Sequence, residues 1–170
     1  MLKSSQNGRL CNRKMTKPLN KLSLMLCSAI LVNAAEYGTY FEKYGNAYSI
    51  PPQLLWGVAK HESGLDPYAV NKNTNGTYDL GLMQINSIHL PMLRKKGIEA
   101  KDLFNPETNI AVGAYILSDC FNRFGHNWKG LTCYNGKIEG NDYALKVMSK
   151  VKRELSTHKN KEIERVALSN

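Results

Sequence analysis

The stretch Leu54–Glu62, which reads Leu-Leu-Trp-Gly-Val-Ala-Lys-His-Glu, constrains the fold of this chain more than any other. Pro51 and Pro52 precede it and suit the first turn of a helix, because the N–H that proline lacks would have no intrahelical partner there. Helical spacing places the apolar side chains on one stripe, and Glu62 continues that stripe. The pattern therefore predicts a helix that turns a carboxylate toward the protein interior. The apolar members of the stripe are Leu54, Leu55, Val58 and Ala59.

The inward carboxylate of Glu62 has three interpretations. It is a structural ion-pair partner, a solvated residue at a frayed helix end, or a functional acid. If apolar side chains surround it, they disfavour the charged form and raise the pKa of Glu62 into the range of a general acid. His61 points about 100° away around the helix, so it cannot share a target with Glu62 and is expected at the rim. The candidate apolar neighbours are Trp56, Leu65, Leu82 and Met83.

Residues 1–35 differ in composition from the rest of the chain. Six basic residues precede the uncharged apolar run Leu22–Val32, and the small residues Asn33, Ala34 and Ala35 follow it. This order is typical of a secretory signal peptide, and the run is shorter than the roughly 20 residues that a membrane-spanning helix needs. We therefore expect a signal peptide at 1–35, a mature domain at 36–156, a polar tail at 157–170 and a periplasmic location without stable membrane insertion. A retained membrane anchor is the alternative.

The net charge of +9 belongs mostly to this leader. Removing its six basic residues, and no acidic ones, leaves +3. Such a mild excess suits an anionic polymer, but no basic stripe interleaved with aromatic residues is present, so no nucleic-acid partner is predicted.

The cysteines agree with export. Cys11 and Cys27 lie in the leader, which leaves Cys120 and Cys133 in the mature chain. An even pair in an oxidising compartment predicts a disulfide, worth roughly 3 kcal/mol for so short a loop. No Cys or His cluster has the spacing of metal ligands, so no metal site is predicted.

The mature chain is predicted to be mainly α-helical. An aromatic stripe from Tyr37 to Tyr48 marks a first amphipathic helix. Gly64–Leu80 is rich in Asn, Gly and Asp and predicts an ordered excursion or a short hairpin. Asn105 and Gly125 bracket what should be the longest helix, and Trp128–Tyr134 a short one. A last amphipathic helix should end near Leu155, followed by a loose polar segment.

Three motifs, in this order, resemble those of the soluble lytic transglycosylase family. They are His61-Glu62-Ser63-Gly64-Leu65-Asp66-Pro67, Asp79-Leu80-Gly81-Leu82-Met83-Gln84-Ile85-Asn86 and Cys133-Tyr134-Asn135-Gly136. Asn105-Pro106, Asn109-Ile110, Gly113 and Tyr115 also resemble the long helix of that family. Within the family, the likeness is greatest to small exported proteins that accompany type III and type IV secretion, conjugation and pilus assembly. The resemblance covers roughly residues 37–155.

The resemblance implies a single lysozyme-like domain of the goose type, mainly α-helical, with a cleft for a glycan strand. By similarity, Glu62 is the catalytic acid that cleaves the bond between N-acetylmuramic acid and N-acetylglucosamine and forms a 1,6-anhydro ring. Tyr134 would reach Glu62 and orient it. No cofactor is implied; the partners would be peptidoglycan strands and components of a secretion, conjugation or pilus machine, and the protein would be a monomer. The substrate-binding residues implied by similarity are Ser63, Gly81, Met83, Gln84, Tyr134, Asn135 and Tyr143.

Two other functions remain open from the sequence. A hydrolytic lysozyme would share the fold and Glu62, and Asp79 is a candidate second carboxylate for such chemistry. A non-catalytic wall-binding or assembly module would keep the cleft and tolerate loss of the acid.

Overall fold

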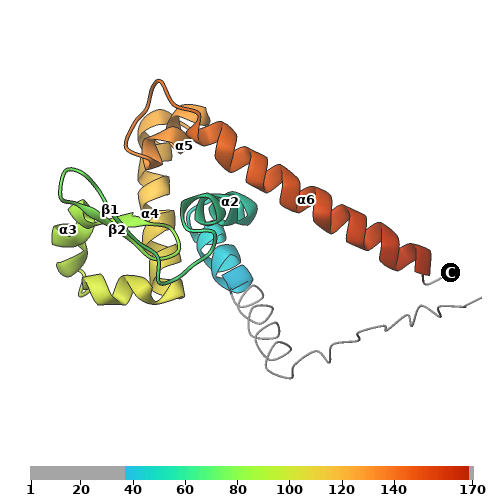
Figure 1. Ribbon diagram of the computed structural model, residues 1–170, viewed down its shortest axis with the longest axis horizontal. Coiled ribbons are helices and arrows are strands. Elements are labelled where there is room, and N and C mark those ends of the chain that lie inside the picture. The colour runs from blue at the N-terminus through green and yellow to red at the C-terminus, as the bar shows by residue number, and fades with distance from the viewer. Residues whose placement is uncertain (1–36, 169–170) are drawn as a thin grey trace, which may run out of the picture. The chain divides into compact units, whose positions relative to one another are not determined.

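The computed structural model describes residues 37–168, so the predicted signal peptide lies outside the described residues. The described part is mainly helical, with one small sheet (Figure 1), which confirms the predicted fold class. It opens with a helix through residues 37–47. The elements that follow are α2 (Pro52–Glu62), β1 (Val70–Lys72), β2 (Tyr78–Leu80), β3 (Ile85–Asn86), η1 (Ser87–His89), α3 (Leu90–Arg94), η2 (Ala100–Phe104), α4 (Pro106–Phe124), α5 (Trp128–Tyr134) and α6 (Tyr143–Leu168).

Helix α2 begins and ends where the sequence predicts. Pro52 occupies its first turn, and Glu62 is its last residue. Leu55, Val58 and Ala59 are fully buried, so the predicted stripe faces the core. Gly57 lets α6 approach closely, since a Cβ there would lie 2.4 Å from a side-chain carbon of Val151.

The predicted hairpin is confirmed. Strands β1 and β2 pair antiparallel with Val70 opposite Leu80, and β2 pairs with β3 with Asp79 opposite Asn86. The resulting three-stranded sheet has the order β1-β2-β3. It places Asp79 between two neighbouring strands rather than in a loop.

Asn109 on α4 joins this sheet to the helical core. Its side chain is fully buried. Its Oδ1 accepts a hydrogen bond from the N–H of Met83 at 2.7 Å, while its Nδ2 donates to the carbonyls of Leu80 at 2.9 Å and Leu103 at 2.8 Å. One side chain therefore satisfies three buried backbone groups from two separate segments.

Helices α4 and α5 are joined by the predicted disulfide. Asn105 caps α4 by accepting from the N–H of Thr108, and Gly125 ends it at a φ of 80°. Cys120 on α4 is bonded to Cys133 on α5, with their Cα atoms 5.7 Å apart. The bond fixes α5 directly beside the second half of α4.

Helix α6 differs from the prediction. It has 26 residues against the 19 of α4, so the prediction that α4 is the longest helix is wrong, and so is that of a loose segment after Leu155. The polar sequence there is rich in Lys and Glu, which favour helix, and a contact of 3.0 Å between Glu154 and His158, four residues apart, supports it. Residues 156–168 are exposed.

No helix within residues 37–168 is long and apolar enough to cross a membrane.

We expect Asn109→Leu to lower the free energy of unfolding by about 3 kcal/mol or more, because the leucine leaves the buried N–H of Met83 and the two carbonyls without partners. Urea unfolding at neutral pH measures this. Asn122→Leu is the matched control, since Asn122 lies on the same helix and is exposed. Equal effects of the two substitutions would contradict the structural role of Asn109.

Candidate active site

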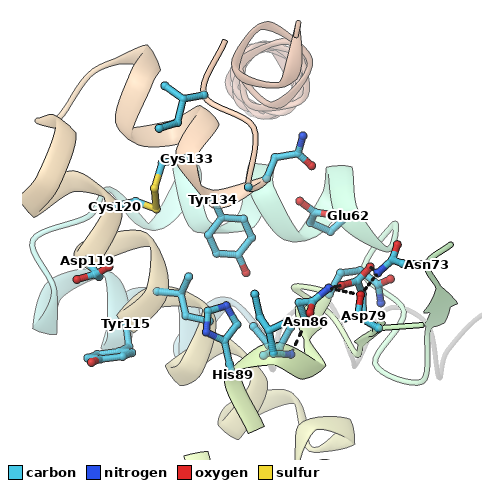
Figure 2. Close-up of a pocket in the computed structure, with 18 of the residues that line it drawn as sticks. Glu62, Asn73, Asp79, Asn86, His89, Tyr115, Asp119, Cys120, Cys133 and Tyr134 are labelled. Atoms are coloured by element: carbon cyan, nitrogen blue, oxygen red, sulfur yellow. Dashed lines mark hydrogen bonds between the residues drawn. A yellow bond between two sulfur atoms is a disulfide. The ribbon is translucent and has the colours of Figure 1, made fainter. Parts of the chain in front are cut away.

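A cavity of about 810 Å³ runs alongside α4 (Figure 2). The hairpin and β3 form one wall, and α4 with the end of α5 forms the other. Glu62 and Asn73 lie toward one end in Figure 2, and Tyr115 and Asp119 toward the other, with Tyr134 between them. The cavity is elongated and lined by polar side chains, as suits a chain-like polar ligand.

Glu62 reaches this cavity from the last turn of α2 and is half-buried. The pKa of Glu62 is raised to about 7: burial raises it most, a hydrogen bond from Tyr143 lowers it, and the nearby negative charge of Asp79 raises it. No ion pair to Glu62 forms among residues 37–168. These observations exclude the structural ion-pair interpretation within the described chain and favour that of an acid which can be protonated near neutral pH.

The tyrosine that contacts Glu62 is Tyr143 rather than Tyr134. The hydroxyl of Tyr143 donates to Oε1 of Glu62 at 2.5 Å, whereas that of Tyr134 donates to the carbonyl of Met83 at 2.8 Å. The resemblance implied that Tyr134 reaches and orients Glu62; among the described residues the hydrogen bond to Glu62 comes instead from Tyr143. Tyr143 is buried at the start of α6, against α2, with its ring edge-on to His61.

Three of the predicted substrate-binding residues lie behind the cavity wall. The hydroxyl of Ser63 donates to the carbonyl of Leu82 at 2.7 Å and accepts from two backbone N–H groups, so its hydrogen-bonding capacity is used within the protein. Gly81 and Met83 are buried. All three residues shape the wall and are not among the residues that line the cavity; the same holds for Tyr143.

The remaining three, Gln84, Tyr134 and Asn135, do line the cavity. The Nε2 of Gln84 donates to the carbonyls of Ala69 and Gly81, which fixes its amide. The side-chain oxygen of Gln84 makes no hydrogen bond to residues 37–168. The side-chain oxygen of Gln84 is therefore fixed in position and can accept a hydrogen bond from a ligand.

The sequence did not identify the polar network on the sheet. Asp79 accepts from Nδ2 of Asn73 at 2.9 Å and from Nδ2 of Asn86 at 2.7 Å (Figure 2). From the sequence, the Asn-rich segment predicts only turns. In the folded hairpin, alternate side chains point to the same face, and this brings Asn73, Asp79 and Asn86 together. The sequence also did not identify four other residues that line the cavity, because hydrophobic periodicity does not show which faces of two separate helices meet. They are His89 on η1 and Tyr115, Asp119 and Arg123 on α4.

Within residues 37–168, no group of three or more His, Cys, Asp or Glu side chains is arranged to hold a metal ion. The residues that line the described site can supply proton transfer by Glu62 and hydrogen bonding by the amides and tyrosines around it.

We expect the contribution of Glu62 to the free energy of unfolding to fall by about 1–3 kcal/mol as pH rises from about 4.5 to 7, because over this range the folded protein binds more protons at Glu62 than the unfolded chain does. Glu62→Gln keeps an acceptor for Tyr143 and removes the titration. At pH 8 it should be more stable than the wild type by that amount, and at pH 4 equally stable, by urea unfolding. Glu162→Gln, at an exposed position on α6, is the control; a difference for Glu62→Gln that does not vary with pH would contradict the raised pKa.

Comparison with known proteins agrees with this geometry. Residues 39–160 match the family described as "Transglycosylase SLT domain". Invasion protein IagB of Salmonella typhimurium is 43% identical over 89 residues, which cover 52% of this chain and 56% of IagB. The match thus spans little more than half of that relative. A peptidoglycan-binding-like protein of Escherichia coli O157:H7 is 35% identical over 131 residues, covering 71% of this chain and 78% of that protein.

Among solved structures, the 70-kDa soluble lytic transglycosylase of Escherichia coli aligns with a TM-score of 0.50 and 25% identity. The alignment covers 68% of this chain and 19% of that larger protein. The shared part is therefore about a fifth of the solved structure. Since the family match spans most of the described residues and the fold agrees, the chain belongs to the transglycosylase SLT domain family, that of the lytic transglycosylases.

Proposed function

We propose that this chain is a peptidoglycan lytic transglycosylase that cleaves the β-1,4 bond between N-acetylmuramic acid and N-acetylglucosamine and leaves 1,6-anhydromuramyl ends. The observation that carries the proposal is Glu62, a half-buried acid with a pKa of about 7 at one end of an elongated polar cavity. An acid with this pKa gives up and takes back a proton near neutral pH.

In the proposed reaction, Glu62 acts first as an acid and then as a base. Tyr143 donates to Oε1, so the proton of the neutral carboxyl lies on Oε2, where it can be transferred to the glycosidic oxygen as the bond to the muramyl C1 breaks. The resulting carboxylate takes the proton from the muramyl C6 hydroxyl, whose oxygen bonds to C1. Glu62 thus gives up one proton and takes one back, so it ends the reaction protonated as it began, and no water is consumed. Tyr143 acts as a positioning residue.

A single acid suffices in this scheme. Asp79 is the nearest candidate for a second carboxylate, and it is held by Asn73 and Asn86 through one hydrogen bond to each oxygen. The N-acetyl group of the substrate would stabilise the positive charge that develops at C1, in place of a second protein carboxylate. Gln84 and Asn135 supply amide groups of the kind that bind sugar hydroxyl and N-acetyl groups.

The hydrolytic alternative rests on Asp79, which lines the same cavity as Glu62. In a lysozyme, a second carboxylate supports the attack of water, and the product ends in a reducing sugar. The two reactions therefore differ by one water molecule in their products.

We also propose that residues 1–35 are a signal peptide, that residues 36–156 form the catalytic domain in the periplasm, and that residues 157–170 are an appended polar segment. The enzyme would open the wall locally for a secretion, conjugation or pilus apparatus. Similarity to invasion protein IagB supports this role, as does a 36% identical match to protein IpgF of Shigella flexneri.

Incubation of the exported form, with its disulfide oxidised, on purified peptidoglycan should release muropeptides one water lighter than the hydrolytic products, as measured by mass spectrometry. Glu62→Gln should lower the rate by about 100- to 10,000-fold, because it removes the proton donor. Glu162→Gln, the exposed control, should leave the rate unchanged. Reducing-end products would instead indicate a lysozyme, and no products from the folded protein would favour a non-catalytic wall-binding module.

The pH dependence of kcat/KM separates the acid role of Glu62 from a structural one. The rate should fall as pH rises through about 7, the pKa of Glu62. Tyr143→Phe removes a hydrogen bond that favours the carboxylate, so this fall should move to higher pH. A fall at an unchanged pH in Tyr143→Phe would show that another group titrates.

Deletion of the gene should impair assembly of the apparatus that the protein serves, because the wall would no longer be opened at that point. Complementation with the wild type should restore assembly, and complementation with Glu62→Gln should not. Normal assembly in the deletion strain would contradict the role in assembly while leaving the enzymatic proposal intact.

A further inference from the structure

The end of the cavity away from Glu62 differs in charge from the rest. Of the described residues that line the cavity, Arg123 is the only Lys or Arg, and it lies on α4 with Asp119 and Tyr115. His89 also lines the cavity, and burial lowers its pKa below the ordinary value, which favours the neutral ring. The walls around Glu62 carry amides and carboxylates instead. The cavity thus has one cationic position, at its distal end.

The guanidinium of Arg123 is held from two sides. Its Nε lies 3.0 Å from Oδ2 of Asp119, and its Nη2 contacts the sulfur atoms of Cys120 and Cys133 at 3.6 and 3.3 Å. Within residues 37–168, no hydrogen bond uses Nη1. The group is therefore positioned in advance, with donors left for a ligand.

Asp119 does not cancel this cation. The side chains of both partners are more than half exposed, and such exposed pairs are weak. A guanidinium has five N–H donors, so a second carboxylate can bind at the edge that Asp119 does not occupy. Arg is well suited to such a site because its planar fork matches carboxylate geometry.

The chemistry of the proposed substrate identifies the ligand class. N-acetylated sugars carry no charge, and the lactyl group of each muramic acid is amide-bonded to the peptide in intact peptidoglycan. The anionic groups are the free carboxylates of the peptide stems. We propose that Arg123 binds a stem carboxylate and makes this end of the cavity a peptide-stem subsite; the inference rests on peptidoglycan being the substrate.

Asn135, Gly136 and Ile138 also line the cavity. They belong to the connection between α5 and α6, where Asn135 and Gly136 are exposed. The side chain of Arg123 is itself more than half exposed. The subsite therefore has a cation that is open toward solvent, from where a peptide stem can approach.

The test is equilibrium binding by calorimetry to the Glu62→Gln protein, which is not expected to turn over the ligand. The two ligands are a tetrasaccharide of alternating N-acetylglucosamine and N-acetylmuramic acid with tetrapeptide stems, and the same compound with every stem carboxylate converted to a carboxamide. We expect the native ligand to bind about tenfold more tightly at low salt, with the difference shrinking as salt rises. Adding Arg123→Gln should abolish the difference.

Two matched variants separate recognition from structure. Asp119→Asn breaks the same ion pair but frees the cation, so the preference for the native ligand should be kept or increased. Lys129→Gln removes an exposed cation outside the cavity lining and should change nothing. Equal loss for both ligands in Arg123→Gln, or the same loss in Asp119→Asn, would overturn the proposal. The binding test does not depend on Glu62 being catalytic, so failed cleavage alone would count against the proposed function and not against the subsite.

Discussion

The segment Leu80–Met83 connects every part of the site, and the buried amide of Asn109 holds it in place. Asn109 bonds one end of the segment at Leu80 and the other at Met83. The carbonyl of Leu82 accepts from Ser63 beside Glu62, and that of Met83 accepts from Tyr134. A Cβ at Gly81 would lie 2.3 Å from the carbonyl of Leu103 on η2 and 2.4 Å from Nδ2 of Asn109 on α4, so the segment can lie this close to both helices only with glycine there. The positions of α2, α4 and α5 around the cavity therefore depend on one short stretch of backbone.

The charged form of Glu62 lowers the stability of the folded protein, and the surrounding structure must compensate for this. A half-buried carboxylate without a cationic partner among the described residues destabilises the folded state whenever it is charged. Tyr143 reduces this cost by one hydrogen bond, and it is held in place by the packing of α6 against α2. The close approach of those helices requires Gly57 opposite Val151. The acid is thus supported from a helix that lies far away in the sequence.

Local patterns in the sequence predicted most of the fold and only part of the site. Pro51 and Pro52, Asn105 and Gly125 mark helix ends through interactions within a few residues, so α2 and α4 were placed correctly. The length of α6 was not predicted because its residues from 156 to 168 are exposed and mostly polar, so that helix propensity is the main signal in the sequence for these turns. Tyr134 and Tyr143 could not be distinguished, since which hydroxyl reaches Glu62 depends on how α5 and α6 pack. Ser63, Gly81 and Met83 belong to the site motifs, yet they form the wall behind the cavity.

The disulfide connects the end of the cavity that holds Arg123 to its middle, where Tyr134 lies. Cys120 is one residue from Asp119 and three from Arg123 on α4, and Cys133 immediately precedes Tyr134 on α5. The disulfide therefore positions the guanidinium of Arg123, which contacts both sulfur atoms. It also holds the backbone next to Tyr134, whose hydroxyl donates to the carbonyl of Met83. Without the bond, α5 would keep only its noncovalent packing on α4, and Tyr134 and Arg123 would no longer share a rigid support. Formation of the disulfide is thus a condition for the common support of Arg123 and Tyr134 as well as a contribution to the stability of the fold.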